Sequence, residues 1–330
     1  MTNCRFARLL TALALTLALG SGLMAQGIPQ TGPLETLVLD QVRGSDTTPV
    51  VTQVALDPLG RFLATAGDDH VVRILDAWSG EILHRLEGHT DWVRSCAFGP
   101  EGKLLATAGQ DRQILLWDPA TGRRVQRLAE LPMAVFTLAI SPDGRILAAG
   151  GFGTRIHLFE LATGQPLPAA ETAGRDVRAL AFSADSSLLA TAGSQGLIRV
   201  LTTDGSRPVQ DLPGDGRTVR ALAFRGDGAQ LASAGDGAEI SLWDMTTGSQ
   251  AGTLPARPGK IMSLTYCGGQ YLAAGGSYNT IRLWDTAARR EALQLTGHTG
   301  SVSTLVFNAE AGQLISGGFD TTVRLWALSR

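Results

Sequence analysis

Two sets of residues in this chain combine a hydroxyl, an imidazole and a carboxylate, the groups that a nucleophilic triad uses. Both sets end on a tryptophan at the same distance from the histidine. The first set is His89, Thr107, Asp111 and Trp117, and the second is His298, Ser316, Asp320 and Trp326. A catalytic site is seldom duplicated within one chain. We therefore interpret both sets as structural, predict no catalytic residue, and do not expect an enzyme.

Other motifs that could indicate catalysis or ligand binding are weaker. The sequence has no Gly-x-Ser-x-Gly elbow, no phosphate-binding glycine loop and no Cys/His spacing of a metal site. The remaining histidines, His70, His84 and His157, share no position in the repeats described below. The adhesion-like tripeptide Arg225–Asp227 occupies an expected turn, and Pro255–Pro258 is a lone Pro-x-x-Pro. We predict no metal and no cofactor.

Composition limits the class of protein. The 330 residues are 44% hydrophobic and 18% charged, and 40 are glycine. That much apolar sequence can bury a large core, and high glycine with low charge favours short strands and tight turns. The net charge of −2 lacks the excess of basic residues that a phosphate backbone requires. We therefore expect no nucleic-acid partner.

The N-terminus has the pattern of an export signal. Arg5 and Arg8 precede an apolar run over Leu9–Leu19, and Ala25 offers a small residue for cleavage. The run is shorter than the roughly 20 residues that span a bilayer. We predict a signal peptide over 1–25 and a linker over 26–33. The export signal, the excess of Arg over Lys and the absence of retention signals together predict a bacterial periplasmic location, without a membrane span after the signal is removed. A retained anchor is the alternative.

The three cysteines are too few for a disulfide framework. Cys4 leaves with the predicted signal peptide. Cys96 and Cys267 fall in apolar strand segments of non-adjacent repeats, so we expect two buried free thiols.

A period of 42 residues organises the rest of the chain. One series of large apolar residues follows it with a single step of 41, at Leu75, Trp117, Phe159, Leu201, Trp243, Trp284 and Trp326. A second series has the same intervals, in segments 51–56, 93–98, 135–140, 177–182, 219–224, 261–266 and 302–307. Two series that agree over seven copies establish the repeat.

Each repeat has the pattern of four short strands joined by glycine-containing turns. Its first segment alternates apolar and polar residues, and its second is rich in alanine and glycine, which lets neighbouring sheets approach closely. The last repeat lacks a fourth strand, because Trp326 stands four residues from the end of the sequence. An unassigned strand-like segment at 34–42 can supply it.

These features resemble the WD40 repeat family. The resemblance rests on Trp117-Asp118, Trp243-Asp244, Trp284-Asp285, Gly88-His89 and Gly297-His298. It implies an all-β fold over 34–330, a seven-bladed β-propeller of four-stranded antiparallel blades. Segment 34–42 would join the last blade and close the ring.

The resemblance also assigns roles to residues. It implies that His, Ser/Thr, Asp and Trp of each set at the start of this section share buried hydrogen bonds within one blade. It further implies that one propeller face, formed by the loops before the first strands and between the second and third, binds a protein partner. The candidate residues of that face are Trp92, Arg94, Phe136, Phe152, Arg178, Arg220, Asp236, Met262 and Phe319.

We therefore expect an exported monomer that acts as a rigid protein–protein interaction scaffold. The structural alternative for each arginine is packing along its strand or pairing with a local acid. The functional alternative is a propeller enzyme or small-ligand binder that uses the central channel.

Overall fold

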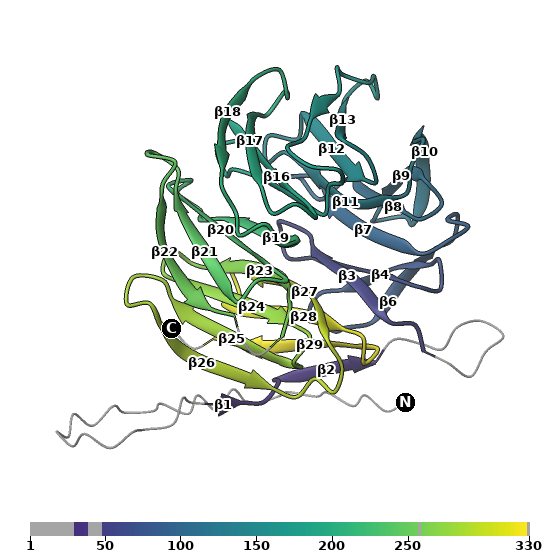
Figure 1. Cartoon of the computed structure of the whole chain (residues 1–330). Helices are drawn as coiled ribbons and strands as arrows, with labels where there is room; N and C mark the ends of the chain where they lie inside the picture. Colours follow the sequence, from purple (N-terminus) through teal and green to yellow (C-terminus); the bar gives the residue numbers. More distant parts are fainter. Residues whose placement is uncertain (1–29, 39–47, 257–258, 329–330) are drawn as a thin grey trace, which may run out of the picture.

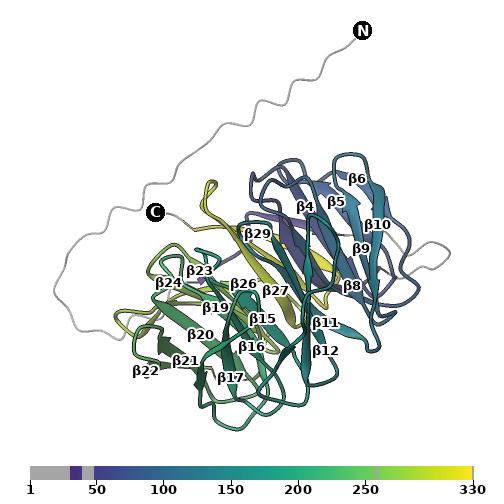
Figure 2. The same ribbon diagram turned by 90° about the horizontal axis from the view of Figure 1, so that it is seen from above.

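The computed structural model describes residues 30–38, 48–256 and 259–328. The predicted signal peptide lies outside these residues, and so do positions 39–42 of the predicted closing segment. Within the described residues the strands form seven sheets around a common axis (Figures 1 and 2). The innermost strand of each sheet contacts those of both neighbours, and the seventh contacts the first. The predicted seven-bladed all-β propeller is confirmed.

The first three blades follow the chain in order. Blade 1 contains β3 (Val51–Leu56), β4 (Phe62–Gly67), β5 (Val72–Asp76) and β6 (Ile82–Leu86). Blade 2 contains β7 (Val93–Phe98), β8 (Leu105–Gly109), β9 (Gln113–Asp118) and β10 (Arg123–Glu130). Blade 3 contains β11 (Val135–Ile140), β12 (Ile146–Gly151), β13 (Arg155–Glu160) and the short β14 (Ala170–Glu171).

The next three blades have the same order. Blade 4 contains β15 (Ala179–Phe182), β16 (Leu188–Ala192), β17 (Ile198–Thr202) and β18 (Pro208–Leu212). Blade 5 contains β19 (Val219–Phe224), β20 (Gln230–Gly235), β21 (Glu239–Asp244) and β22 (Gln250–Pro255). Blade 6 contains β23 (Ile261–Cys267), β24 (Tyr271–Gly276), β25 (Thr280–Asp285) and β26 (Arg290–Thr296).

Blade 7 closes the ring with a strand from the other end of the chain. It contains β27 (Val302–Asn308), β28 (Gln313–Gly318), β29 (Thr322–Ala327) and β2 (Glu35–Val38). The register pairs Glu35 with Leu325 and Val38 with Thr322, in antiparallel direction. This confirms closure by the N-terminal segment. The preceding β1 (Gln30–Thr31), inside the segment predicted as a linker, pairs in parallel with β26 as a fifth strand of blade 6.

The hydrophobic core lies between blades. Val72 and Ile74 of blade 1, for example, pack in one cluster with Leu105, Leu115 and Trp117 of blade 2. Each such side chain contributes about 1.5–3 kcal/mol when it is fully buried. The seven residues of the tryptophan series are all at most 5% exposed, which places them in the wedges between sheets.

Small residues on the second strands set how closely the blades approach. A Cβ on Gly317 of β28 would lie 2.5 Å from Cγ1 of Val51 in the next blade. A Cβ on Gly150 of β12 would lie 2.4 Å from Cγ1 of Val177. Any larger residue at these two positions would push neighbouring blades apart.

Polar side chains on the innermost strands join successive blades. Ser95 Oγ accepts a hydrogen bond from the Leu138 amide at 2.9 Å. Across the ring closure, Thr304 Oγ1 accepts one from the Val54 amide at 3.3 Å. The same kind of hydrogen bond thus joins consecutive blades and also joins blade 7 to blade 1, where the ring closes.

The two cysteines of the repeats are buried and free, as predicted. Burial raises the pKa of both Cys96 and Cys267 thiols to about 12. Both therefore stay in the unreactive thiol form at neutral pH.

Candidate interaction face

Seven side chains converge at one end of the central channel, one from each blade. Each of them is the residue directly after the first buried aliphatic residue in the innermost segment of its blade. We call these seven residues the channel mouth: Thr52, Arg94, Phe136, Arg178, Arg220, Met262 and Ser303. Together with Phe319 they line a pocket of about 240 Å³.

A repeated backbone irregularity directs these side chains inward. In six of the seven innermost strands the pairing register shifts across the channel-mouth position, for example between Val93 and Ser95 on either side of Arg94. Such a β-bulge leaves one residue out of the hydrogen-bonded ladder. The side chain of that residue then no longer follows the alternation between the two faces of the sheet. Arg178 of blade 4 stands immediately before β15.

Two of the three arginines in the channel mouth form ion pairs with neighbouring acids. Arg178 Nε donates to Asp176 Oδ2 at 2.7 Å, and Arg220 Nε donates to Asp236 Oδ1 at 2.7 Å. Lys260 Nζ stands 3.8 Å from the other oxygen of Asp236. The hydrogen bond from Arg220 is the main reason that the pKa of Asp236 lies below its ordinary value. These arginines fit the expectation of local pairing.

Arg94 is the exception. Its guanidinium carbon lies 4.7 Å from the ring centroid of Trp92, a cation–π contact. Its Nε is buried without a hydrogen-bond partner among the described residues. Burial lowers the pKa of this guanidinium, and the charge of Asp91 opposes that effect. Arg94 thus has unused donor capacity at the channel mouth.

Aromatic side chains surround the arginines. The rings of Phe136 and Phe152 meet edge to face, with centroids 4.5 Å apart. The guanidinium carbon of Arg178 lies 5.1 Å from the Phe136 ring. Phe152, Phe319 and Trp92 are 57%, 44% and 42% exposed. Rigidly held aromatic and arginine side chains are the types enriched among energetically dominant interface residues.

All nine predicted face residues are therefore brought together. Six line the pocket, and Trp92, Phe152 and Asp236 contact members of that six. Sequence reasoning missed Thr52 and Ser303 of the channel mouth, and also Asp176 and Lys260. The first two occupy the same repeat position as the arginines, so the 42-residue frame itself could have identified them.

The first triad-like set forms one buried network in blade 2. His89 Nδ1 donates to Asp111 Oδ2 at 2.8 Å, and its Nε2 lies 2.7 Å from Thr107 Oγ1. Trp117 Nε1 donates to the same hydroxyl at 2.8 Å. Because the carboxylate can only accept, a neutral imidazole receives the hydroxyl proton at Nε2. The Thr107 side chain is wholly buried, and its oxygen takes part in two hydrogen bonds. A nucleophile, in contrast, must be accessible to its substrate.

Blade 7 repeats this geometry. His298 Nδ1 lies 2.9 Å from Asp320 Oδ2, and Nε2 lies 2.7 Å from Ser316 Oγ. Trp326 Nε1 donates to that hydroxyl at 2.8 Å. Burial lowers the pKa of His298. Burial would raise the pKa of Asp320, but hydrogen bonds from the Thr299 amide, the Thr322 hydroxyl and His298 hold it below its ordinary value.

The weaker motifs have local structural contacts. Arg225 and Asp227 form an ion pair at 2.8 Å within a turn, where Gly228 N–H bonds to the Arg225 carbonyl. His84 Nε2 bonds to the Ala120 carbonyl at 3.0 Å. Residues 257–258 of the Pro-x-x-Pro segment lie outside the described residues. In the described ranges, no three or more His, Cys, Asp or Glu residues group so as to hold a metal ion.

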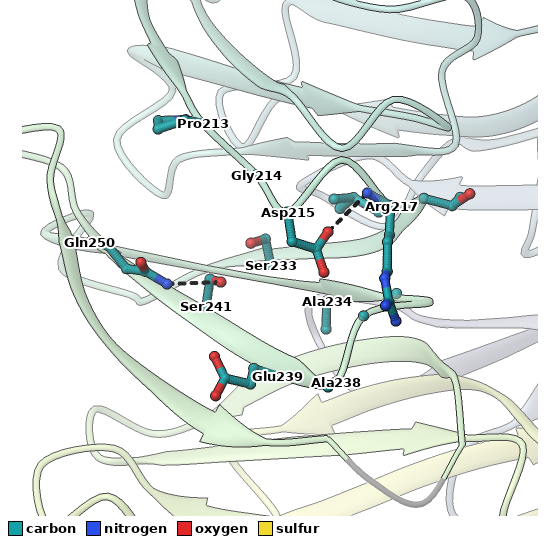
Figure 3. A pocket seen from close by; sticks show the side chains of 14 residues that line it. Pro213, Gly214, Asp215, Arg217, Ser233, Ala234, Ala238, Glu239, Ser241 and Gln250 are labelled. Carbon is teal, nitrogen blue, oxygen red and sulfur yellow. Dashed lines mark hydrogen bonds between the residues drawn. The ribbon is translucent and has the colours of Figure 1, made fainter.

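A pocket larger than the one at the channel mouth lies elsewhere on the ring. It has a volume of about 420 Å³ and lies over blade 5, between the loop that enters β19 and the strands β20–β22 (Figure 3). Asp215, Ser233 and Glu239 point toward this space (Figure 3). Sequence reasoning did not identify it, although the missing histidine of blade 5 is visible in the repeat frame.

Comparison with known families agrees with the repeat frame. The family described as "WD domain, G-beta repeat" matches seven segments, at residues 38–76, 80–118, 126–160, 167–201, 206–244, 248–285 and 290–327. Each segment ends at the tryptophan-series residue or one position after it. The matches cover well over half of the chain.

One curated relative is similar over a short stretch. The "Probable serine/threonine-protein kinase PkwA" of Thermomonospora curvata is 42% identical over 57 residues, which is 17% of this chain and 8% of that protein. The match thus spans a small fraction of the relative's length. Separately, no helix among the described residues is long and apolar enough to cross a membrane.

Proposed function

Since this chain belongs to the WD40 repeat family, whose propellers generally mediate protein interactions, we propose that it is a rigid scaffold that binds a protein partner. The partner would dock over the channel mouth and the exposed aromatic side chains of Trp92, Phe152 and Phe319. No rearrangement of the ring is needed, because these side chains are presented by a closed set of sheets.

The observation that carries this proposal is the bulge shared by six innermost strands. A bulge interrupts ladder hydrogen bonds, so a bulge repeated at one position is a feature that positions side chains. Here it places arginine, phenylalanine and methionine at one opening. Residues of these types are enriched in the buried centres of protein interfaces.

The state of Arg94 indicates the chemistry of the partner. Arg178 and Arg220 already have carboxylate partners, whereas Arg94 has a buried Nε without one. Because the Arg94 side chain is only half-buried, a carboxylate on the partner would reach the exposed part of its guanidinium, and Trp92 would flank the new ion pair. We therefore infer that the partner inserts an acidic side chain beside an apolar group.

Export to a bacterial periplasm is also proposed. It is supported by the basic start, the apolar run at Leu9–Leu19 and the small residue Ala25. Mass spectrometry of the protein purified from the envelope should find Gln26 as the first residue. An N-terminus that retains the apolar run would contradict cleavage.

The partner face is tested by crosslinking and affinity purification from the native envelope, comparing the unaltered chain with Trp92→Ala/Arg94→Ala. This pair is preferable to changes at Arg178 or Arg220, because either would leave a paired acid without its partner. Trp78→Ala is the matched control, since Trp78 is 78% exposed in the turn between β5 and β6, at the opposite ends of the strands.

The double variant should lose the partner while its melting temperature stays unchanged, and the control should keep it. Undiminished capture by the double variant would contradict the assigned face. Loss of capture by Trp78→Ala alone would move the partner to the opposite face.

A further inference from the structure

The pocket over blade 5 corresponds to the place of the histidine in the complete sets. Asp215, Ser233, Gly237 and Trp243 stand 126 positions after His89, Thr107, Asp111 and Trp117. Blade 5 therefore keeps the hydroxyl and the indole, has aspartate in place of the histidine, and has glycine in place of the aspartate. A third exchange, Ser241 in place of Leu115, removes further apolar volume from the same wall.

A carboxylate oxygen is still present close to the position where the complete sets have an aspartate. A Cβ built on Gly237 would lie 2.5 Å from Asp215 Oδ2. This is about the distance between Cβ and a carboxylate oxygen within a single aspartate. Asp215, coming from the loop, thus places one carboxylate oxygen at the distance that an aspartate at 237 would give its own, while its Cγ and Oδ1 lie 3.4 and 3.8 Å from that Cβ. The amide of Arg217 holds Asp215 Oδ1 at 2.9 Å (Figure 3).

The hydroxyl opposite this carboxylate has unused capacity. Trp243 Nε1 donates to Ser233 Oγ at 2.9 Å, as in blade 2. Among the described residues, however, the Ser233 hydroxyl makes no second hydrogen bond, whereas Thr107 has one with His89. Ser233 is 4% exposed and lines the pocket, so its proton has no acceptor except a group that enters there.

We propose that the pocket over blade 5 binds an imidazole ring supplied from outside the chain. One ring nitrogen would accept the proton of Ser233, and the opposite N–H would donate to the Asp215 carboxylate, as His89 does within blade 2. A neutral imidazole offers an acceptor and a donor on opposite sides, whereas guanidinium and ammonium groups only donate. The source would be a histidine side chain of another protein or a free imidazole compound. This site is independent of the partner face.

Calorimetric titration of the untagged full chain with imidazole at pH 7.5 tests the proposal. We expect saturable binding, and binding of N-methylimidazole about tenfold weaker, because the methyl group removes the donor to Asp215. Guanidinium should bind more weakly than imidazole. Absence of saturable binding, or equal binding of all three compounds, would overturn the proposal.

Variants of the chain identify the atoms. Ser233→Ala should weaken imidazole binding about tenfold, and Asp215→Asn less, because that carboxylate is exposed. Ser241→Ala is the matched control, since this pocket hydroxyl bonds to Gln250 and should leave the affinity unchanged. If Ser233→Ala binds imidazole as well as the unaltered chain does, the assigned geometry is wrong.

A filled-pocket variant gives an independent readout. Asp215→His/Gly237→Asp rebuilds the set of blades 2 and 7, and the first change removes the carboxylate that a side chain at 237 would meet. This variant should lose imidazole binding and melt at a higher temperature. Retained binding would contradict the proposal. Tighter binding of the peptide Gly-His-Gly than of imidazole would assign the natural source to a protein side chain, and the reverse to a small molecule.

Discussion

Blades 2 and 7 keep every member of their buried hydrogen-bonded sets, whereas blades 1, 4 and 6 keep only part of them. In each of these three blades, one atom of the partial set is buried without a partner among the described residues: Thr65 Oγ1, Thr191 Oγ1 and Trp284 Nε1. The cause is visible in the repeat frame. Leu75 and Leu201 provide no indole for the two hydroxyls, and Ala274 provides no hydroxyl for Trp284.

Blade 3 provides the contrasting case. It has Leu131, Ala149, Gly153 and Phe159 at the four positions of the set. None of these side chains has a polar atom, so none is left without a partner. A buried polar network is favourable when it is complete and costs little when it is absent, but a partial one carries the desolvation of its orphaned atom. We infer that blades 1, 4 and 6 are the least stable parts of the ring.

The largest effect is expected from removing residues 34–42, which takes the fourth strand from blade 7. Four paired positions link β2 to β29, and their hydrogen bonds contribute about 4 kcal/mol in total. Calorimetry should show a markedly lower melting temperature. If the truncated chain melts with unchanged cooperativity and temperature, the N-terminal strand does not hold the ring closed.

Within the complete blades, His298→Ala should lower the free energy of unfolding by about 3 kcal/mol at pH 7.5, because it leaves Asp320 and Ser316 without their shared partner. Denaturant titration measures the loss. The matched change Leu131→Ala in blade 3 removes only apolar contacts.

The pKa of His298 also leads us to expect that the free energy of unfolding depends on pH. Because burial holds the folded pKa of His298 below its unfolded value near 6.5, the unfolded chain binds a proton that the folded chain does not. The contribution of His298 is therefore complete above pH 6.5 and declines as the pH falls toward the folded pKa. The difference in unfolding free energy between the unaltered chain and His298→Ala should shrink between pH 7.5 and 5.5. A constant difference would contradict a buried neutral imidazole.

Threonine at equivalent positions should respond in opposite directions. Thr191→Val in blade 4 removes an orphaned hydroxyl and should stabilise the chain by about 1 kcal/mol. Thr107→Val in blade 2 removes a hydroxyl that serves Trp117 and His89, and should destabilise it by about 2 kcal/mol. Thermal melts of both variants provide the measurement. Equal effects of the same sign would show that completeness of the set does not determine stability.

The smallest effect is expected in blade 6. Ala274→Ser places a hydroxyl at the position where Thr107 accepts from Trp117, and should give Trp284 Nε1 its missing acceptor. The gain should be about 0.5–1 kcal/mol. Slower hydrogen exchange of the Trp284 indole proton, measured by NMR, would show the new bond. No change in that exchange would mean that the hydroxyl does not reach the indole.

The sequence predicted the fold well because the fold repeats. Seven copies of the tryptophan position and of the alternating first segment set the number of blades, and an unfinished seventh repeat indicated closure by 34–42. The pairing of Gln30–Thr31 with β26 had no such signal. Two residues are too few to show a pattern, and the pairing depends on where ring closure places the chain.

The sequence predicted which residues form the candidate face, but it did not predict the contacts between them. The repeat frame places Arg94, Arg178 and Arg220 at equivalent positions, yet only the folded ring shows that two of them are neutralised by acids. The blade 5 pocket was missed because it arises from residues that are smaller or shorter than their counterparts. Lost volume becomes visible only when the neighbouring blades are in place.

The partner face is tested most directly by site-specific photocrosslinking in the native cells. A photoreactive phenylalanine analogue would replace Phe319 beside the channel mouth in one sample and Trp78 on the opposite side in another. We expect a discrete crosslinked protein from the analogue at Phe319 and none from that at Trp78. Crosslinking only from Trp78 would contradict the assignment of the channel mouth as the partner surface.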